Sequence, residues 1–385
     1  PPFHGDRNLR GVIGDAYIDW LKKTFGIGVK DYCVYWFRKA HDQLAPGTRA
    51  GLVGTNSISQ NRAREASLDY ITQHGGAITN AVSTQDWPGA AAVDVSIVNW
   101  VKGAGGQAAI LDGVEVPGIT SSLAPLGLTQ GSRAQRLIAN RGRAFQGPQP
   151  VGAGFVIDAA EARLLLDRDP TYKEVVRPYL VGDDIANRPD QGPGRWIIDF
   201  GVKSLEEAEA WPEALQIVRE RVKPSRDLNR RPIRRQRWWL LGETVPALRA
   251  AVEGKPRFLA AVVTGKRPFF AWQKPWTCAS NLTNVFAFDD DYSFGILTST
   301  VHERWARAQS STLEDRMRYT PTTAFETFPF PENWEQNAAL EAIGKEYYEY
   351  RSTLMLQHQQ GLTEIYNRFH DPDEQDPGIL KLRAL

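Results

Sequence analysis

The sequence predicts an α/β fold: half of a Rossmann-like sheet, followed by a mixed α+β module and a helical tail. A glycine-bounded apolar run at residues 50–55, followed by a helical pattern at residues 62–74, indicates the strand–loop–helix unit of parallel sheets. Residues 93–101 are β-branched and partly alternating, which is typical of a strand. Residues 334–369 place apolar side chains at three- and four-residue steps, which indicates helices.

The composition is that of a globular protein, with room for roughly two or three domains in 385 residues. Lys plus Arg total 46 against 45 Asp plus Glu, so the overall charge indicates no partner. No apolar run reaches the roughly 18 residues of a membrane span, and the N-terminus lacks the layout of a signal peptide. We therefore expect a cytoplasmic protein that contacts no membrane.

Neither the cysteines nor the acidic residues indicate a metal site. Cys33 and Cys278 are the only two cysteines and are too isolated for a zinc site or a disulfide framework, so both are expected to be packing residues. The three adjacent acids at residues 289–291 would point in different directions. They are expected to form a surface turn.

The first hundred residues contain the expected sheet. Helical spacing of aromatic and apolar residues predicts helices at residues 17–25 and 31–40. Strands are predicted at residues 50–55, 77–83 and 93–101, the last as one arm of an antiparallel hairpin at a sheet edge. A doubly wound sheet needs earlier strands, so we expect the chain to be the back part of a larger protein.

The middle of the chain is expected to form a connector and then a mixed module. Residues 103–150 are rich in Gly, Pro, Ser and Ala, with a predicted helix at residues 129–145 that carries Arg133, Arg136, Arg141 and Arg143. The module is predicted to contain helices at residues 159–167 and 205–215, and strands near residues 196–200 and 258–263.

An arginine-rich segment is the strongest candidate for contact with nucleic acid. Residues 219–239 hold nine Lys or Arg against two acids, interleaved with Asn229, Gln236 and a tryptophan pair. Guanidinium groups form bidentate bonds with phosphates and with guanine, so the pattern favours DNA contact over a solvated charged face. The candidate contacts, most of them to phosphates, are Arg226, Arg230, Arg231, Arg234, Arg235 and Arg237.

A second basic region follows a predicted strand. It adds Lys266, Arg267, Arg316 and Arg318 to the candidate DNA contacts. His302 lies on a predicted helix with no second His, Cys or Ser elbow nearby, so a structural or DNA-backbone role is expected for it.

Several motifs together resemble one enzyme family. They are Pro1-Pro2-Phe3-His4-Gly5, Gly51-Leu52-Val53-Gly54-Thr55-Asn56-Ser57-Ile58, Trp87-Pro88-Gly89, Arg195-Trp196-Ile197-Ile198-Asp199-Phe200, Phe294-Gly295-Ile296-Leu297-Thr298-Ser299, Arg318-Tyr319-Thr320 and Phe325-Glu326-Thr327-Phe328-Pro329-Phe330-Pro331. This series resembles gamma-class N6-adenine DNA methyltransferases, and more closely the MmeI-like enzymes. These are type IIL and IIG restriction-modification proteins that fuse methyltransferase and target recognition domains.

The resemblance implies a domain order. Residues 1–120 would be the C-terminal part of the methyltransferase domain, whose sheet would be the Rossmann-like one. Residues 121–147 would be a connector, residues 148–333 the DNA target recognition domain, and residues 334–385 a C-terminal helical segment.

The resemblance also implies a catalytic role for Pro1, Pro2 and Phe3, as the remainder of an Asn-Pro-Pro-Phe loop. A target adenine must be flipped out of the duplex; the Pro1 carbonyl would accept from its amine, and Phe3 would stack on the base. Asn56, Ser57 and Trp87 would line the base pocket. The alternatives are that Ser59 or Asn61 caps the next helix and that Trp87 anchors a loop.

The family's cofactor is S-adenosylmethionine, and its partner is double-stranded DNA. The loop Asn and the methyl-donor motif are absent from this sequence, so the chain alone is expected to be inactive. The missing N-terminal portion, or a separate chain, would supply them. Two other readings stay open: a DNA-binding specificity module without catalysis, and an RNA-modifying enzyme.

Overall fold

The computed structural model describes residues 9, 12–88, 93–103, 108–126, 134–313 and 316–385. The chain divides into two compact units. Unit 1 is Pro1–Ala134 with Ser310–Glu314, and unit 2 is Gln135–Gln309 with Asp315–Leu385. The two are described separately. In the described part of the chain, no helix is long and apolar enough to cross a membrane.

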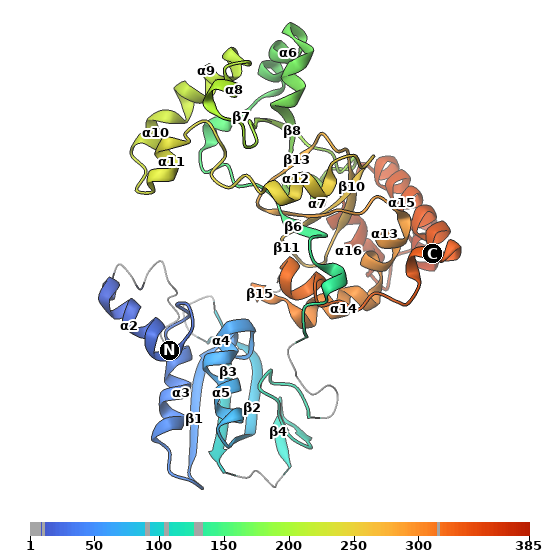
Figure 1. Ribbon diagram of the computed structural model, residues 1–385. Helices are drawn as coiled ribbons and strands as arrows, with labels where there is room; N and C mark the ends of the chain where they lie inside the picture. Colours follow the sequence, from blue (N-terminus) through green and yellow to red (C-terminus); the bar gives the residue numbers. More distant parts are fainter. Residues whose placement is uncertain (1–8, 10–11, 89–92, 104–107, 127–133, 314–315) are drawn as a thin grey trace. The chain divides into compact units, whose positions relative to one another are not determined.

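Unit 1 is a mixed sheet covered by helices (Figure 1). The strand order is β1-β3-β2-β4-β5, and Trp100 and Val98 of β3 are buried against Phe37 of α3 and Ile71 of α5. The helices are α2 (Asp15–Phe25), α3 (Cys33–Gln43), α4 (Asn61–Ala66) and α5 (Leu68–Gln73), with the 3-10 turn η1 at Asn56–Ser59. The strands are β1 (Arg49–Thr55), β2 (Gly76–Asp86), β3 (Asp94–Lys102), β4 (Ala109–Leu111) and β5 (Val114–Val116), and β15 (Ser311–Leu313) comes from the later segment.

The position of β3 in the sheet differs from the prediction. β2 and β3 form the expected antiparallel hairpin, but β3 lies between β2 and β1 rather than at an edge. One face of β3 is buried and the other is mostly half-buried, and a β-branched run suits such a central strand. β1 and β2 are both antiparallel to β3, so they run in the same direction without being neighbours.

The helix predicted at residues 62–74 is broken. α4 ends at Ala66, and α5 begins at Leu68 after Ser67, whose φ of −122° and ψ of −94° are not helical. The Ser67 hydroxyl is buried and lies 2.8 Å from the carbonyl oxygens of both Ile58 and Ala63. This local side-chain bonding competes with the helix and bends the chain.

Unit 2 holds two four-stranded sheets and the antiparallel pair of β11 with β16. One sheet, β12-β10-β14-β6, is antiparallel throughout; the other, β13-β8-β9-β7, has one parallel pair, β13 with β8. The strands are β6 (Ala144–Gln146), β7 (Val156–Ile157), β8 (Val176–Leu180), β9 (Arg195–Ile198), β10 (Phe258–Val262), β11 (Thr264–Gly265), β12 (Phe270–Gln273), β13 (Cys278–Ala279), β14 (Thr283–Phe286) and β16 (Arg316–Arg318).

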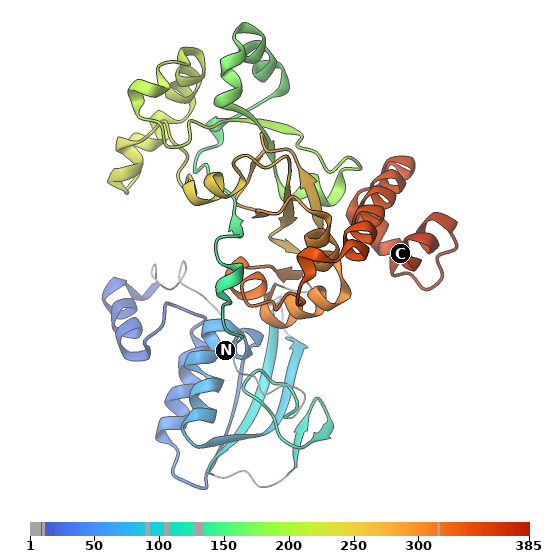
Figure 2. The same ribbon diagram turned by 45° about the vertical axis from the view of Figure 1, so that its right-hand side comes forward.

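Helices surround these sheets (Figure 2). The predicted helix at residues 205–215 is split, since α9 begins at Pro212, which cannot continue a preceding helix. The helices are α6 (Ala159–Arg168), α7 (Gly182–Asn187), α8 (Leu205–Ala208), α9 (Pro212–Arg221), α10 (Lys223–Asp227), α11 (Pro232–Gln236), α12 (Pro246–Val252), α13 (Asp291–Thr298), α14 (Thr300–Gln309), α15 (Ala338–His358), α16 (Leu362–Phe369) and α17 (Pro377–Ala384).

The helix predicted at residues 129–145 is wrong where the structure describes it. Residues 134–146 form a 3-10 turn, Ile138–Asn140, and then β6. The buried Asn140 amide donates to the carbonyls of Phe325 and Phe328, and β6 pairs with β14, so tertiary bonds override the local pattern. Arg133 lies outside the described residues.

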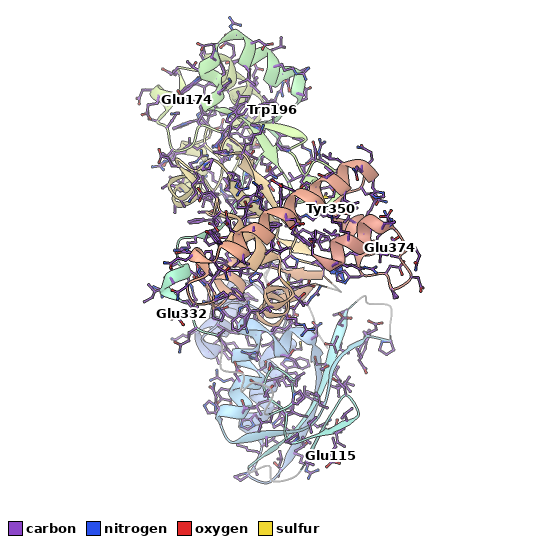
Figure 3. The ribbon with its side chains drawn as sticks, turned by 90° about the vertical axis from the view of Figure 1, so that its right-hand side faces the viewer. Glu115, Glu174, Trp196, Glu332, Tyr350 and Glu374 are labelled. Carbon is purple, nitrogen blue, oxygen red and sulfur yellow. The ribbon has the colours of Figure 1, made fainter. Side chains whose placement is uncertain are left out.

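The C-terminal helices pack on the unit 2 core. A Cβ at Gly344 of α15 would lie 2.2 Å from the Asp291 carbonyl oxygen, so the glycine permits close approach to α13. Arg351 is fully buried, donates to the Phe270 carbonyl at 2.7 Å and stacks on aromatic rings. Tyr350, labelled in Figure 3, donates to the Gly378 carbonyl of α17 at 3.1 Å.

His302 of α14 is part of the unit 2 core. Its exposure is 0%, and its Nε2 lies 3.0 Å from the hydroxyl of the buried Tyr319. Burial therefore excludes a DNA-backbone contact in this structure and supports the structural alternative. Burial also lowers the pKa of His302 from its ordinary 6.5 to about 3.

This shift predicts acid sensitivity. Between pH 6.5 and about 3 the unfolded chain binds a proton at His302 that the folded protein does not, so stability falls as pH falls through this window. The limiting slope is about 1.4 kcal/mol per pH unit, so the wild type should lose about 2 kcal/mol more than His302→Gln between pH 7 and pH 5.

Denaturant unfolding at the two pH values measures this difference. His74→Gln, at an exposed histidine of unit 1, is the matched control and should lose as much stability as the wild type. Equal losses in the wild type and His302→Gln would contradict the buried neutral state.

Candidate nucleic-acid interface

The arginine-rich segment folds into two short helices joined by a tight turn. α10 and α11 each have proline in the first turn, where a missing N–H costs nothing. In the turn, the Asn229 side-chain oxygen accepts from the Arg231 N–H at 3.0 Å, and the Asn229 carbonyl accepts from Arg235 at 2.5 Å. The segment therefore has a defined backbone.

The tryptophan pair anchors the segment instead of facing a nucleic acid. Trp238 is 7% exposed and belongs to the hydrophobic core around β8 and β9. Trp239 donates its indole N–H to the Lys203 carbonyl at 3.0 Å. The guanidinium of Arg219 lies 5.7 Å from the Trp238 ring, which ties α9 to the same anchor.

Arg226 corrects the predicted set of DNA contacts. It is 1% exposed, and its Nη2 donates to the carbonyls of Pro150 at 2.8 Å and Leu240 at 3.2 Å. Burial, with a smaller contribution from Arg234, lowers the pKa of Arg226. A guanidinium without access to solvent cannot reach a phosphate, so its role here is structural.

The other arginines of the segment keep access to solvent. Arg230, Arg231, Arg235 and Arg237 are exposed, and none of them pairs with a carboxylate among the described residues. Arg234 is partly covered, with its Nη2 3.9 Å from Glu243. The exposed four form an uncompensated positive surface, called the α11 surface below.

The pairing of β11 with β16 brings most of the second basic region together. β11 pairs with β16 so that Gly265 lies opposite Met317, which points inward at 3% exposure. Arg316 and Arg318 are therefore on the outer side of β16, beside the exposed Lys266. Arg267 is less available, because its side chain is 23% exposed and lies 3.8 Å from Glu303.

In unit 1, the predicted base-pocket residues lie at one edge of the sheet. Thr55, at the end of β1, and Gln85, near the end of β2, both pair with Val95 of β3. Two strand spacings, about 10 Å, therefore separate Thr55 from Gln85. The residues that follow them, Asn56 with Ser57 and then Trp87, leave the sheet at this edge. Trp87 is 37% exposed, and its backbone N–H donates to the Val93 carbonyl.

A carboxylate that the sequence prediction missed holds this edge. Asp31 Oδ2 accepts from the hydroxyls of Thr55 at 2.8 Å and Ser57 at 3.0 Å. Its position just before α3 was the only sequence signal. The capping alternative is not supported for Ser59, whose hydroxyl donates to the Asn56 carbonyl, while the N-cap of α4 is Gln60.

The remaining predicted catalytic residues, Pro1, Pro2 and Phe3, lie outside the described residues. The side chain of Asn61 is likewise not described.

Comparison with known proteins identifies the family. A family model described as MmeI, target recognition domain, matches residues 132–332. The structure of the type IIL restriction-modification enzyme MmeI in complex with DNA is 20% identical, with a TM-score of 0.74 over 92% of this chain and 48% of that chain. The type IIG restriction endonuclease BpuSI is 11% identical, with a TM-score of 0.33 over 91% and 48%. No curated protein sequence matches.

The chain thus spans about half the length of both solved structures. Its likeness to MmeI is a likeness of fold. Because the family model covers more than half of the 385 residues, the chain belongs to the MmeI target recognition domain family.

Proposed function

We propose that this chain is part of a site-specific DNA adenine-N6 methyltransferase that serves restriction-modification or phage defence, and that unit 2 is its DNA-recognition part. The observation that carries the proposal is the α11 surface: four exposed arginines with no carboxylate partner among the described residues, on a backbone fixed by buried residues. A solvated charged face has no need of such anchoring. Family membership, and the DNA complex of MmeI, support duplex DNA as the partner.

Recognition would use the two basic regions of unit 2 differently. The α11 surface presents exposed guanidinium groups suited to bidentate phosphate contacts, which would set the position of the protein on the duplex. Arg316, Arg318 and Lys266 lie on a short strand pair and its loop, which could reach base edges in a groove.

Unit 1 would belong to the methyltransferase domain, as the C-terminal half of its Rossmann-like sheet. Among the described strands, β1 pairs only with β3, so the strands of the other half could add to its free side. The edge that carries Asn56, Ser57 and Trp87 would form part of the pocket for the flipped adenine, with Phe3 as the stacking ring. S-adenosylmethionine would be held mainly by the part of the parent protein outside this chain.

One prediction concerns the salt dependence of duplex binding. Each phosphate contact contributes about 0.9 to the slope of log K against log salt. Replacing Arg230, Arg231, Arg235 and Arg237 by Ala should therefore reduce the slope by roughly 3 to 4, as measured by fluorescence anisotropy with a labelled duplex.

Arg163→Ala and Lys345→Ala remove exposed cations on α6 and α15 and serve as controls that should leave the slope unchanged. An unchanged slope in the variant with all four substitutions would show that the α11 surface does not contact DNA. A folded RNA that outcompetes the duplex would instead favour the RNA-modifying reading.

Another prediction concerns methyl transfer. The isolated chain should transfer no methyl group from S-adenosylmethionine to duplex DNA, whereas the parent protein with its upstream segment should methylate adenine. In the parent, Phe3→Ala should slow transfer roughly 5- to 150-fold, because stacking of one base on an aromatic ring is worth about 1–3 kcal/mol.

Trp20→Ala, at an exposed aromatic residue of α2, is the matched control and should retain activity. Robust transfer by the isolated chain would contradict the need for an upstream part. A parent that binds DNA but methylates nothing would favour the pure specificity module.

A further inference from the structure

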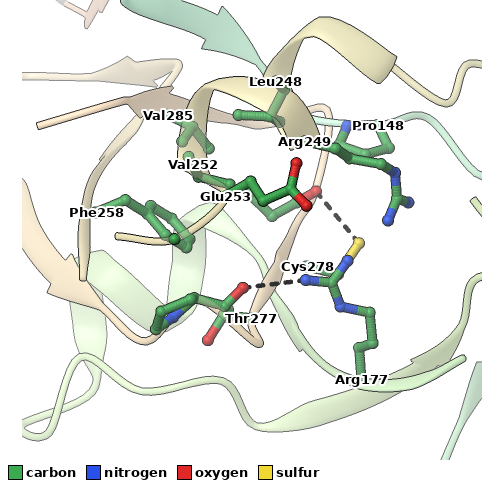
Figure 4. A pocket seen from close by; sticks show the side chains of 13 residues that line it. Pro148, Arg177, Leu248, Arg249, Val252, Glu253, Phe258, Thr277, Cys278 and Val285 are labelled. Atoms are coloured by element: carbon green, nitrogen blue, oxygen red, sulfur yellow. Dashed lines mark hydrogen bonds between the residues drawn. The ribbon is translucent and has the colours of Figure 1, made fainter. Parts of the chain in front are cut away.

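A cavity of about 330 Å³ lies within unit 2, between α12 and the strands β8, β10 and β13 (Figure 4). We propose that this cavity binds a small organic anion, with a carboxylate on an apolar body. Two arginines and several apolar side chains line it, and Figure 4 shows Arg177 and Arg249 on the side opposite Phe258. The proposal rests on these residues and not on the proposed DNA function.

The positive and negative charges of Arg177, Arg249 and their carboxylate partner do not balance. Asp199 is buried, and its Oδ2 pairs with Arg249, lies 3.9 Å from Arg177 Nη1 and accepts from the Cys278 thiol at 3.6 Å. Its Oδ1 accepts from the Gly201 N–H at 3.0 Å. One carboxylate thus faces two guanidinium groups, which leaves one positive charge in excess.

Arg177 gains no further negative charge from its other contacts. Its Nε and Nη2 donate to the backbone carbonyls of Trp276 at 3.0 Å and Pro275 at 3.1 Å, which are neutral. Glu253 lines the cavity but is exposed, so water screens its charge. The excess charge therefore stays with the largely covered guanidinium groups, whose side chains are 17% and 28% exposed.

Contact with a ligand would come from the outer atoms of the two guanidinium groups. The Nε of Arg249 has no hydrogen-bond partner in the described structure, but it is closed to solvent and so lies out of reach of a molecule in the cavity. Bonds from the partly exposed guanidinium groups to an anionic oxygen would be short and strong. A carboxylate in the cavity would also balance the excess charge.

The remaining lining of the cavity is mostly apolar and so suits the apolar part of a ligand. Leu248 and Val252 of α12, Phe258 of β10 and Val285 of β14 contribute side chains to the lining. The volume is at the small end of ligand pockets, which span about 300–1,000 Å³. A DNA phosphodiester would gain nothing from these apolar walls, so a free aromatic or aliphatic carboxylate fits better than a strand of the duplex.

Benzoate is a suitable probe, with benzyl alcohol as its neutral counterpart, in calorimetric or ligand-observed NMR titrations of the full 385-residue chain. Benzoate should bind saturably at one site. Binding should weaken about tenfold or more for benzyl alcohol and for Arg249→Met, which each lose a charge-assisted bond. Val252→Trp should abolish binding by filling the cavity, and Leu164→Trp, at a residue 74% exposed on α6, should not.

Val252→Trp keeps the test decisive if Arg249→Met does not fold. The proposal is overturned if benzoate shows no saturable binding, if Val252→Trp binds it as the wild type does, or if benzyl alcohol binds equally well. Displacement of benzoate by a short duplex would also overturn it, in favour of a backbone phosphate. None of these outcomes affects the predicted salt dependence of duplex binding by the α11 surface, so either proposal can be wrong while the other holds.

Discussion

The arginine-rich segment depends on the burial of Arg226. Its guanidinium connects carbonyls of Pro150 and Leu240, residues far apart in the chain, and lies 5.5 Å from the Phe155 ring. No described carboxylate pairs with it, so the carbonyl dipoles and the aromatic face must offset its desolvation. The exposed arginines of the segment repel one another, so they cannot by themselves keep the segment in one conformation. The buried contacts of Arg226 supply the attachment that the segment needs. Trp238, buried in the core, fixes the other end.

A carboxylate holds the surrounding side chains at each of two proposed sites. Asp31 holds the end of β1 in unit 1 through two hydroxyl groups, and Asp199 holds two arginines of unit 2 at a cavity. In both, a carboxylate fixes flexible polar side chains in one arrangement. Preorganisation of this kind reduces the entropy that a ligand must overcome on binding.

The sequence predicts the type of most elements, because their patterns are local. The helices at α2, α3 and α6 and the strand β10 follow from apolar spacing. It fails where tertiary bonds decide: Ser67 breaks a helix by bonding to Ile58, and Asn140 draws residues 138–140 toward Phe325 and Phe328. For the same reason the arginine count predicted a basic surface but could not tell Arg226, which faces the core, from Arg230 and Arg231, which face water. Burial of a charged side chain depends on partners distant in sequence.

The central claim, that the α11 surface faces DNA, is tested most directly by photo-crosslinking. Ile233 lies on α11 among the arginines and is 51% exposed, so a photoreactive benzoylphenylalanine there can report contact. The account predicts crosslinks from position 233 to a bound duplex, and none from Leu164 on α6. A chain that binds the duplex but forms no crosslink from position 233 would contradict it.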